Sequence, residues 1–154
     1  CLVGSEMCIR DRYVRSLPKE MDIMFQEIDM EYRTGYELTL ELIQQVPQIT
    51  AIAGTNDMVA LGIRDALLKE KYKIPEDISV IGCDNLLFSG LRGIDLTTVE
   101  HYVSKKGEDA CEILIQEMGE QKAKNNSIVE NMVHHIEYEP RLVVRGSSSY
   151  PKLK

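Results

Sequence analysis

The chain has 154 residues, of which 44% are hydrophobic and 28% are charged, and its formal net charge is −7. These values fit an ordinary globular domain with one modest core. The acidic balance argues against a segment that grips phosphate backbones by itself, although it says nothing about other parts of a longer protein. The longest apolar runs are the size of a strand, so no membrane-spanning segment is predicted.

Residues 1–12 read CLVGSEMCIRDR and resemble a translated sequencing adaptor. One reading frame of a transposase-type adaptor encodes Leu2 through Asp11 in order, a match that chance does not explain. We therefore expect this segment to be foreign to the protein and set it apart from the fold. The protein proper is expected to start near Tyr13, in the middle of a longer chain.

The first predicted elements are a helix end, a strand and a helix. Tyr13–Leu17 fits the tail of a helix that a following proline stops, and Asp22–Met30 fits a strand. Glu31–Val46 is predicted to be a helix because its apolar residues recur at three- and four-residue spacing. Pro47 ends it.

A second strand and helix follow. Ile49–Thr55 is short and apolar, which predicts a buried strand. Met58–Lys71 has a helical pattern, and Asn56 and Asp57 before it are good helix starters. Pro75–Asp77 is typical of a turn.

The rest of the chain continues the alternation. In order, the pattern predicts a buried strand at Ile78–Cys83, a short helix at Leu86–Leu91, a strand at Leu96–Glu100, a long helix at Val103–Lys124, one or two closing strands within His134–Val144, and a frayed tail from Gly146. Alternating strands and helices with apolar strands indicate an α/β fold with a doubly wound parallel sheet.

In such sheets, ligands bind outside the carboxyl ends of the strands. Two polar pairs follow predicted strands directly: Asn56 with Asp57, and Asp84 with Asn85. Parallel strands would bring both pairs to one edge of the sheet. We therefore expect Asn56 and Asp84 to face a common cleft.

Three segments, which carry four motifs in series, resemble the LacI/GalR family of transcriptional regulators. They are TAIAGTNDMVALGIRDALLKEKYKIPEDISVIGCDN (50–85), LTTVEH (96–101) and EPRLVVRGSS (139–148). Each motif alone is weak, but they occur in the family's order and spacing, and the resemblance extends over residues 13–149.

The resemblance implies a periplasmic-binding-protein-like sensor of two lobes, preceded by a helix-turn-helix headpiece. Residues 13–149 would form part of the sensor and residues 150–154 a tail. Within the sensor, residues 13–100 and 132–149 would belong to the C-terminal lobe and residues 103–124 to a helix of the N-terminal lobe. The headpiece and most of the N-terminal lobe are expected to lie outside this chain.

The resemblance also suggests three effector-binding residues. Asp84 would accept hydrogen bonds from effector hydroxyls, although an aspartate there could instead cap a helix or fix a turn. Asn56 offers an amide donor and acceptor but could equally cap the next helix. His101 could reach the cleft or be an exposed hinge residue, and Asp57 is expected to be a cap or a backbone-fixing residue.

One departure from the family concerns the pocket wall. Cys83 stands where the family usually has Phe or Tyr, so one side of the pocket is expected to be smaller. The family's effector-contacting arginine has no match in this chain.

No metal site, cofactor or catalytic centre is predicted. The four cysteines, Cys1, Cys8, Cys83 and Cys111, show no CxxC spacing, so free thiols are expected. His134 and His135 would alternate on a strand and face opposite sides, which disfavours joint metal binding. No nucleophile elbow, phosphate loop or zinc-protease motif is present, so we do not expect an enzyme.

The leading functional hypothesis is the sensor of a cytoplasmic, LacI-type regulator. It would bind a small-molecule effector such as a sugar, would act as a homodimer, and would reach operator DNA only through the headpiece. The alternative is an extracytoplasmic sugar-binding protein of a transporter, which has the same fold.

Overall fold

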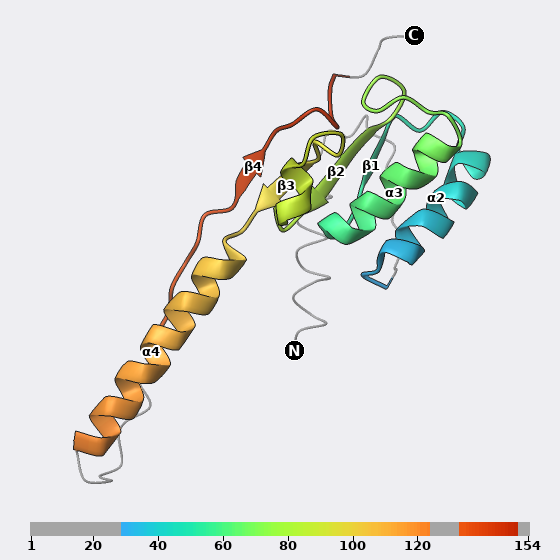
Figure 1. Ribbon diagram of the computed structural model, residues 1–154. Helices are drawn as coiled ribbons and strands as arrows, with labels where there is room; N and C mark the ends of the chain where they lie inside the picture. Colours follow the sequence, from blue (N-terminus) through green and yellow to red (C-terminus); the bar gives the residue numbers. More distant parts are fainter. Residues whose placement is uncertain (1–28, 124–132, 151–154) are drawn as a thin grey trace, which may run out of the picture.

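The computed structural model describes residues 29–123 and 133–150, which form a mixed α/β fold (Figure 1). Its sheet has the strand order β1-β2-β3-β4. The strands are β1 (Ala51–Ala53), β2 (Ser79–Cys83), β3 (Thr97–Glu100) and β4 (Arg141–Val143). The first three are parallel to one another, and β4 is antiparallel to β3. The predicted α/β fold with a mainly parallel sheet is confirmed.

The helices lie where the sequence predicts them. They are α2 (Tyr32–Gln45), α3 (Asp57–Lys69), the short 3₁₀ helix η1 (Leu87–Gly90) and α4 (Val103–Ala123). The predicted helix tail at Tyr13–Leu17, and nearly all of the predicted strand at Asp22–Met30, lie outside the described residues. None of the helices in the described ranges is long and apolar enough to cross a membrane.

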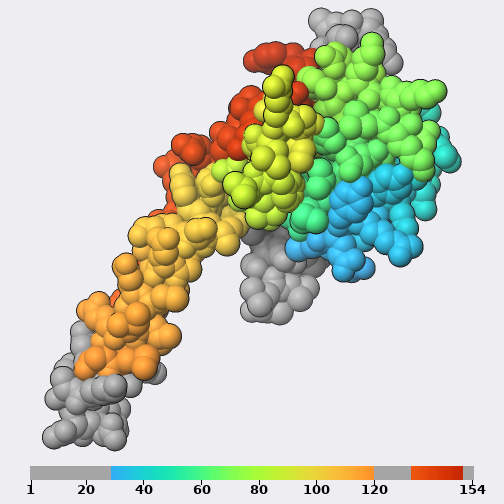
Figure 2. All heavy atoms as spheres, viewed as in Figure 1, coloured from blue at the N-terminus to red at the C-terminus, as the bar shows by residue number. Residues whose placement is uncertain are grey.

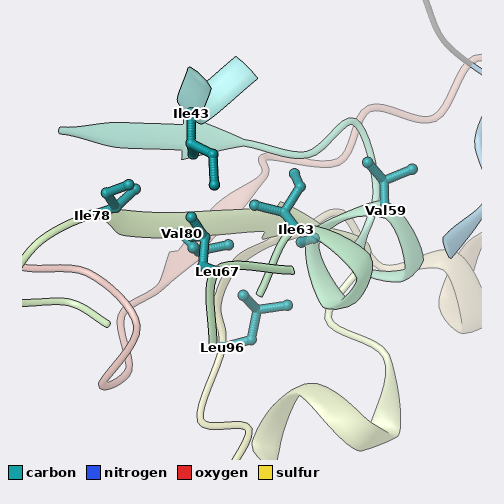
Figure 3. Packing of buried hydrophobic residues seen from close by; sticks show 8 residues of the cluster. Ile43, Val59, Ile63, Leu67, Ile78, Val80 and Leu96 are labelled. Atoms are coloured by element: carbon teal, nitrogen blue, oxygen red, sulfur yellow. The ribbon is translucent and has the colours of Figure 1, made fainter. Parts of the chain in front are cut away.

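The core forms where α3 packs on β2 and α2 packs on α3 (Figure 3). Its buried side chains are Ile43, Val59, Ala60, Ile63, Leu67, Ile78, Val80 and Leu96. The two helices can approach closely because Gly62 has no side chain: a β-carbon there would lie 2.1 Å from the carbonyl oxygen of Tyr32. This packing fixes the N-terminal end of α3 beside the carboxyl end of β2.

The strand predicted as buried at Ile49–Thr55 is instead an edge strand among the described elements. Only Ala51–Ala53 pair with a neighbour, β2, and both alanines are exposed. Ile52 lies between them and packs against the core. An apolar run therefore predicted the strand correctly but not its place in the sheet.

Of the closing strands predicted within His134–Val144, only β4 (Arg141–Val143) forms. Residues 133–140 do not join the sheet. This segment instead contacts α4: Tyr138 donates a hydrogen bond of 2.5 Å to Asp109. The sequence predicted a strand at His134 and His135, but neither residue lies on one. His134 instead pairs with Glu117, and His135 pairs with Glu137.

Residues 147–149, which the sequence predicted to be part of a frayed tail, are bonded to the sheet. Ser147 is only 3% exposed. Its backbone carbonyl accepts from the backbone N–H of Val80, and its hydroxyl lies 2.6 Å from the carbonyl of Val80 and 2.8 Å from the backbone nitrogen of Thr97. The prediction of a frayed tail was wrong for these residues, because their partners are distant in sequence, and residues 151–154 lie outside the described residues.

Helix α4 extends away from the sheet, accompanied by residues 133–140 (Figures 1 and 2). Leu114, Ile115 and Met118 on this helix are more than half exposed. A helix that carries exposed large apolar side chains has an uncovered surface of the kind that packs against another element.

Candidate functional site

Three polar residues occupy one edge of the sheet. Asn56 comes shortly after β1, Asp84 directly after β2 and His101 directly after β3. Because β1, β2 and β3 are parallel, these positions share the carboxyl edge, as the sequence predicted. This is the edge where open α/β sheets bind ligands.

Asp84 and His101 are in direct contact, a pairing that the sequence did not predict. His101 Nε2 lies 2.7 Å from Asp84 Oδ1, and the two side chains are 30% and 28% exposed. On the other side of the ring, Lys106 Nζ lies 3.1 Å from His101 Nδ1.

This chain of contacts fixes the imidazole tautomer. A lysine ammonium group can only donate, so Nδ1 must accept and cannot carry a proton. The proton of the neutral ring is therefore on Nε2, which donates to the Asp84 carboxylate. The second carboxylate oxygen of Asp84 has no hydrogen-bond partner among the residues that the structure describes, so it can accept hydrogen bonds from a ligand.

The backbone that carries Asp84 has an uncommon conformation. Asp84 and Asn85 have φ angles of 110° and 51°, in a region that most side chains disfavour. Asn85 compensates with side-chain bonds: its amide nitrogen donates to Glu100 (2.8 Å), and its amide oxygen accepts from Arg145 (2.6 Å). The turn after β2 is thus tied both to β3 and to the C-terminal segment.

The hydrogen bond from Asn85 also changes the pKa of Glu100. The hydrogen bond from Asn85, together with one from the backbone N–H of Tyr102 (2.6 Å), lowers the pKa of the Glu100 carboxyl below its ordinary value of 4.5. Both donors stabilise the charged form. A carboxylate is therefore maintained at the end of β3, next to His101.

Asp57 is the polar residue that holds this edge together from inside. It is fully buried and accepts hydrogen bonds from Thr98 (2.5 Å), Ser89 (2.5 Å) and the backbone N–H of Leu86 (2.8 Å). These donors come from β3, η1 and the turn after Asp84. The backbone-fixing role expected for Asp57 is what the structure shows.

Asn56 caps α3. Its side-chain oxygen accepts from the backbone N–H of Val59 at 2.8 Å, and its amide nitrogen donates to the carbonyl of Met30 at 3.2 Å. Both polar groups are therefore engaged within the chain. The structure brings Asp84 and His101 together but shows no contact between them and Asn56.

Cys83 adds a thiol to the site. It is half-buried at the end of β2. Burial raises the pKa of its thiol above the ordinary value, and the nearby carboxylates of Asp84 and Asp57 raise it further. The possible ligand atoms of Cys83, Asp84 and His101 all lie within 4.8 Å of one another. A search of the sequence for metal-ligand spacing misses this cluster, because its residues come from the ends of two neighbouring strands, β2 and β3.

The chain matches one family model over residues 12–148, that of the periplasmic binding protein-like domain. Among curated proteins it is similar to the HTH-type transcriptional repressor PurR of Mannheimia succiniciproducens, with 33% identity over 121 residues. That alignment covers 79% of this chain but only 34% of the relative. The chain thus spans about a third of the length of this curated relative.

Solved structures agree with the sequence match. A LacI-family transcriptional regulatory protein from Corynebacterium glutamicum superposes with a TM-score of 0.64 at 29% identity, over 78% of this chain and 43% of that one. A LacI family transcriptional regulator from Enterococcus faecium, with bound ribose, gives a TM-score of 0.65 at 25% identity. Its alignment covers 80% of this chain and 42% of that structure.

Proposed function

Because the chain belongs to the periplasmic binding protein-like domain family, we propose that it forms the C-terminal part of the effector sensor of a LacI-type transcriptional regulator. The similarity to a PurR repressor and to LacI-family structures supports this assignment. In the full-length protein, a helix-turn-helix headpiece would bind operator DNA, and the regulator would act as a cytoplasmic homodimer.

The effector proposed is a polyhydroxylated small molecule such as a sugar. The observation that carries this proposal is the contact between Asp84 and His101 at the carboxyl edge of the parallel strands. His101 holds this carboxylate in place, and the second carboxylate oxygen can accept charge-assisted hydrogen bonds from the hydroxyls of a sugar. The ribose bound to the Enterococcus faecium regulator is consistent with this class of ligand.

Asn56 is proposed as a further contact at the same edge. Its amide would have to exchange its bond to the carbonyl of Met30 for one to the effector. Its cap to Val59 uses the other end of the amide and could persist.

We assign α4 to the opposite lobe of the sensor. Its direction away from the sheet and its exposed apolar residues suit a helix that packs against parts of the N-terminal lobe. Residues 29–100 and 133–149 would then belong to the C-terminal lobe. Effector binding would close the two lobes on each other and change the spacing of the headpieces, a two-state coupling.

An extracytoplasmic sugar-binding protein shares the fold, but the curated relative described above is a repressor, which favours the regulator. An enzyme is not proposed, because Asp84, His101 and Asp57 are all engaged in bonds that hold the site together.

The test uses the full-length protein encoded at the locus. A panel of pentoses, hexoses and disaccharides is screened by thermal shift, and the best ligand is titrated calorimetrically against the unmodified protein and the Asp84→Asn variant. Loss of a hydrogen bond to a charged group should weaken binding roughly ten- to a hundredfold with little change in melting temperature. Asp77→Asn, in the turn before β2, is the matched control and should bind normally.

A lowered melting temperature with unchanged affinity would show that Asp84 is structural. In a gel-shift assay, the full-length protein should bind its own promoter and be released or recruited by the ligand, whereas the 154-residue chain should not bind. If the gene encodes a signal peptide upstream of Tyr13 instead of a helix-turn-helix, the regulator hypothesis is wrong. The protein would then be the extracytoplasmic sugar-binding protein of a transporter.

A further inference from the structure

A thiol, a carboxylate and an imidazole converge at the carboxyl edge of the sheet. Cys83 Sγ, a carboxylate oxygen of Asp84 and a ring nitrogen of His101 lie within 4.8 Å of one another, and each side chain is partly exposed to solvent. Sulfur, nitrogen and oxygen donors in this combination suit zinc, which is borderline soft. We infer that these three residues bind a divalent transition metal, with Zn²⁺ the best match.

The geometry needs only a small closure around the ion. Zinc bonds of about 2.0–2.3 Å in a tetrahedral arrangement place ligand atoms roughly 3.3–3.8 Å apart. The widest pair of the cluster, at most 4.8 Å apart, would therefore move together by no more than about 1.5 Å. Asp84 and His101, now 2.7 Å apart, would separate slightly as the metal replaces the proton between them. Three protein ligands leave the fourth position open for water or another ligand.

Metal binding requires two protons to be rearranged. The thiol of Cys83 must lose its proton to solvent, since the thiolate is the ligand. The ring of His101 must carry its remaining proton on Nδ1 so that Nε2 can bind the metal. One proton is thus released for each ion bound, and binding should weaken as pH falls.

Lys106 opposes this rearrangement. Its ammonium group now donates to His101 Nδ1, which keeps the ring in the tautomer that cannot bind through Nε2. Its positive charge also repels a cation. Lys106 is exposed on α4, so its flexible side chain can turn into solvent when the metal binds. Removing Lys106 should therefore strengthen metal binding.

The site shares Asp84 with the proposed effector. If the proposed function is correct, the metal would draw negative charge from the Asp84 carboxylate that the effector also uses, and it would change the effector concentration at which the regulator responds. This consequence rests on the proposed function, whereas metal binding itself does not.

The experiment uses the 154-residue chain with Cys1, Cys8 and Cys111 changed to Ser, so that Cys83 is the single thiol. Co²⁺ is titrated in while the thiolate-to-cobalt charge-transfer band and the visible ligand-field bands are recorded, and Zn²⁺ is then added to displace it. We expect one ion per chain and tetrahedral-type bands that Zn²⁺ abolishes. Circular dichroism checks that each variant is folded.

Variants assign the ligands. Cys83→Ser should remove the charge-transfer band, and His101→Gln and Asp84→Asn should each weaken binding by more than the roughly 10- to 100-fold that losing an outer-shell partner costs. Lys106→Gln should bind more tightly. The double variant His134→Ala/His135→Ala is the matched control and should bind normally.

The inference fails if the single-thiol chain gives no charge-transfer band, or if the band survives in His101→Gln. Zn²⁺ protection of Cys83 from alkylation in the unmodified chain provides a readout that needs no substitution, and absence of protection would also refute the site. Because no effector is present in these measurements, their failure would leave the proposed sensing function untouched.

Discussion

Gly82 lies so close to Asp57 that a β-carbon at position 82 would be 2.2 Å from Oδ1 of the carboxylate. The absence of a side chain on β2 therefore allows the first turn of α3 to approach the sheet. The buried carboxylate can then accept hydrogen bonds from Thr98 and Ser89. Gly82 on the strand and Asp57 on the helix thus act together to shape the carboxyl edge of the sheet.

Gly82→Ala should destabilise the fold by roughly 1–3 kcal/mol, because the new methyl group forces Asp57 or the strand to move. The free energy of unfolding is measured by urea denaturation. Gly107→Ala is the matched control: nothing lies within 4 Å of a β-carbon at this helical position. That variant should gain about 0.5–1 kcal/mol from helix propensity. Equal effects of the two substitutions would contradict the close approach.

Asn56→Ala should cost about 1 kcal/mol, because the backbone N–H of Val59 loses its cap. Asn56→Asp keeps an oxygen acceptor at this position and places a negative charge at the N-terminus of α3, which is favourable. It should therefore restore most of the stability. Thermal denaturation of the unmodified protein and the two variants gives the order of their melting temperatures. An aspartate variant as unstable as the alanine variant would contradict the capping role of Asn56.

Stability should depend on the charge of Glu100 at acidic pH. Its folded-state pKa is lowered, so the contribution is present above the ordinary value of 4.5 and is lost as pH falls through the folded-state value. Glu100→Gln has one amide oxygen for two donors, so it should be less stable near neutral pH, by under about 1 kcal/mol given solvent screening. The difference in unfolding free energy between the two proteins should shrink as pH falls below 4.5 and through the lowered folded-state pKa of Glu100. A difference that is independent of pH would contradict the assignment.

Cys83 should react with iodoacetamide several-fold more slowly than Cys111 at slightly alkaline pH. The raised pKa of Cys83 reduces its thiolate fraction, and its partial burial limits access. Cys111 is exposed on α4. Mass spectrometry of peptides at successive times, in a variant with Cys1 and Cys8 changed to Ser, gives both rates. Faster labelling of Cys83 would mean that the edge of the sheet opens more than the structure indicates.

Local patterns predicted most of the fold. The predicted helix at Glu31–Val46 and the predicted strand at Ile78–Cys83 agree with α2 and β2 to within one residue at each end, because a long periodic stretch or a short β-branched run has few alternative structures. The place of β1 at the edge of the sheet that the described residues form was not predictable, since it depends on which strands pair with β1. The order around Ser147 depends on residues more than forty positions away, such as Val80 and Thr97.

The candidate site was predicted in part. Parallel strands necessarily bring Asp84 and His101 to one edge, so their neighbourhood followed from the fold class. Their contact, and the approach of Lys106 from α4, depend on the left-handed backbone at Asp84 and the path of the chain after β3. Neither this backbone conformation nor this chain path produces a periodic pattern of residues that could be recognised in the sequence.

The bonds from the C-terminal segment to the rest of the sheet set an order of events during synthesis. Arg145 holds Asn85 in the turn beside Asp84, and Ser147 ties β2 to the start of β3. The ribosome makes Arg145 60 residues after Asn85, the turn residue that it holds. The edge that carries Asp84 can therefore reach its final form only after Arg145 and Ser147 have been made. A premature stop before Arg145 would leave a chain with every predicted site residue but without the bonds that hold the site in place.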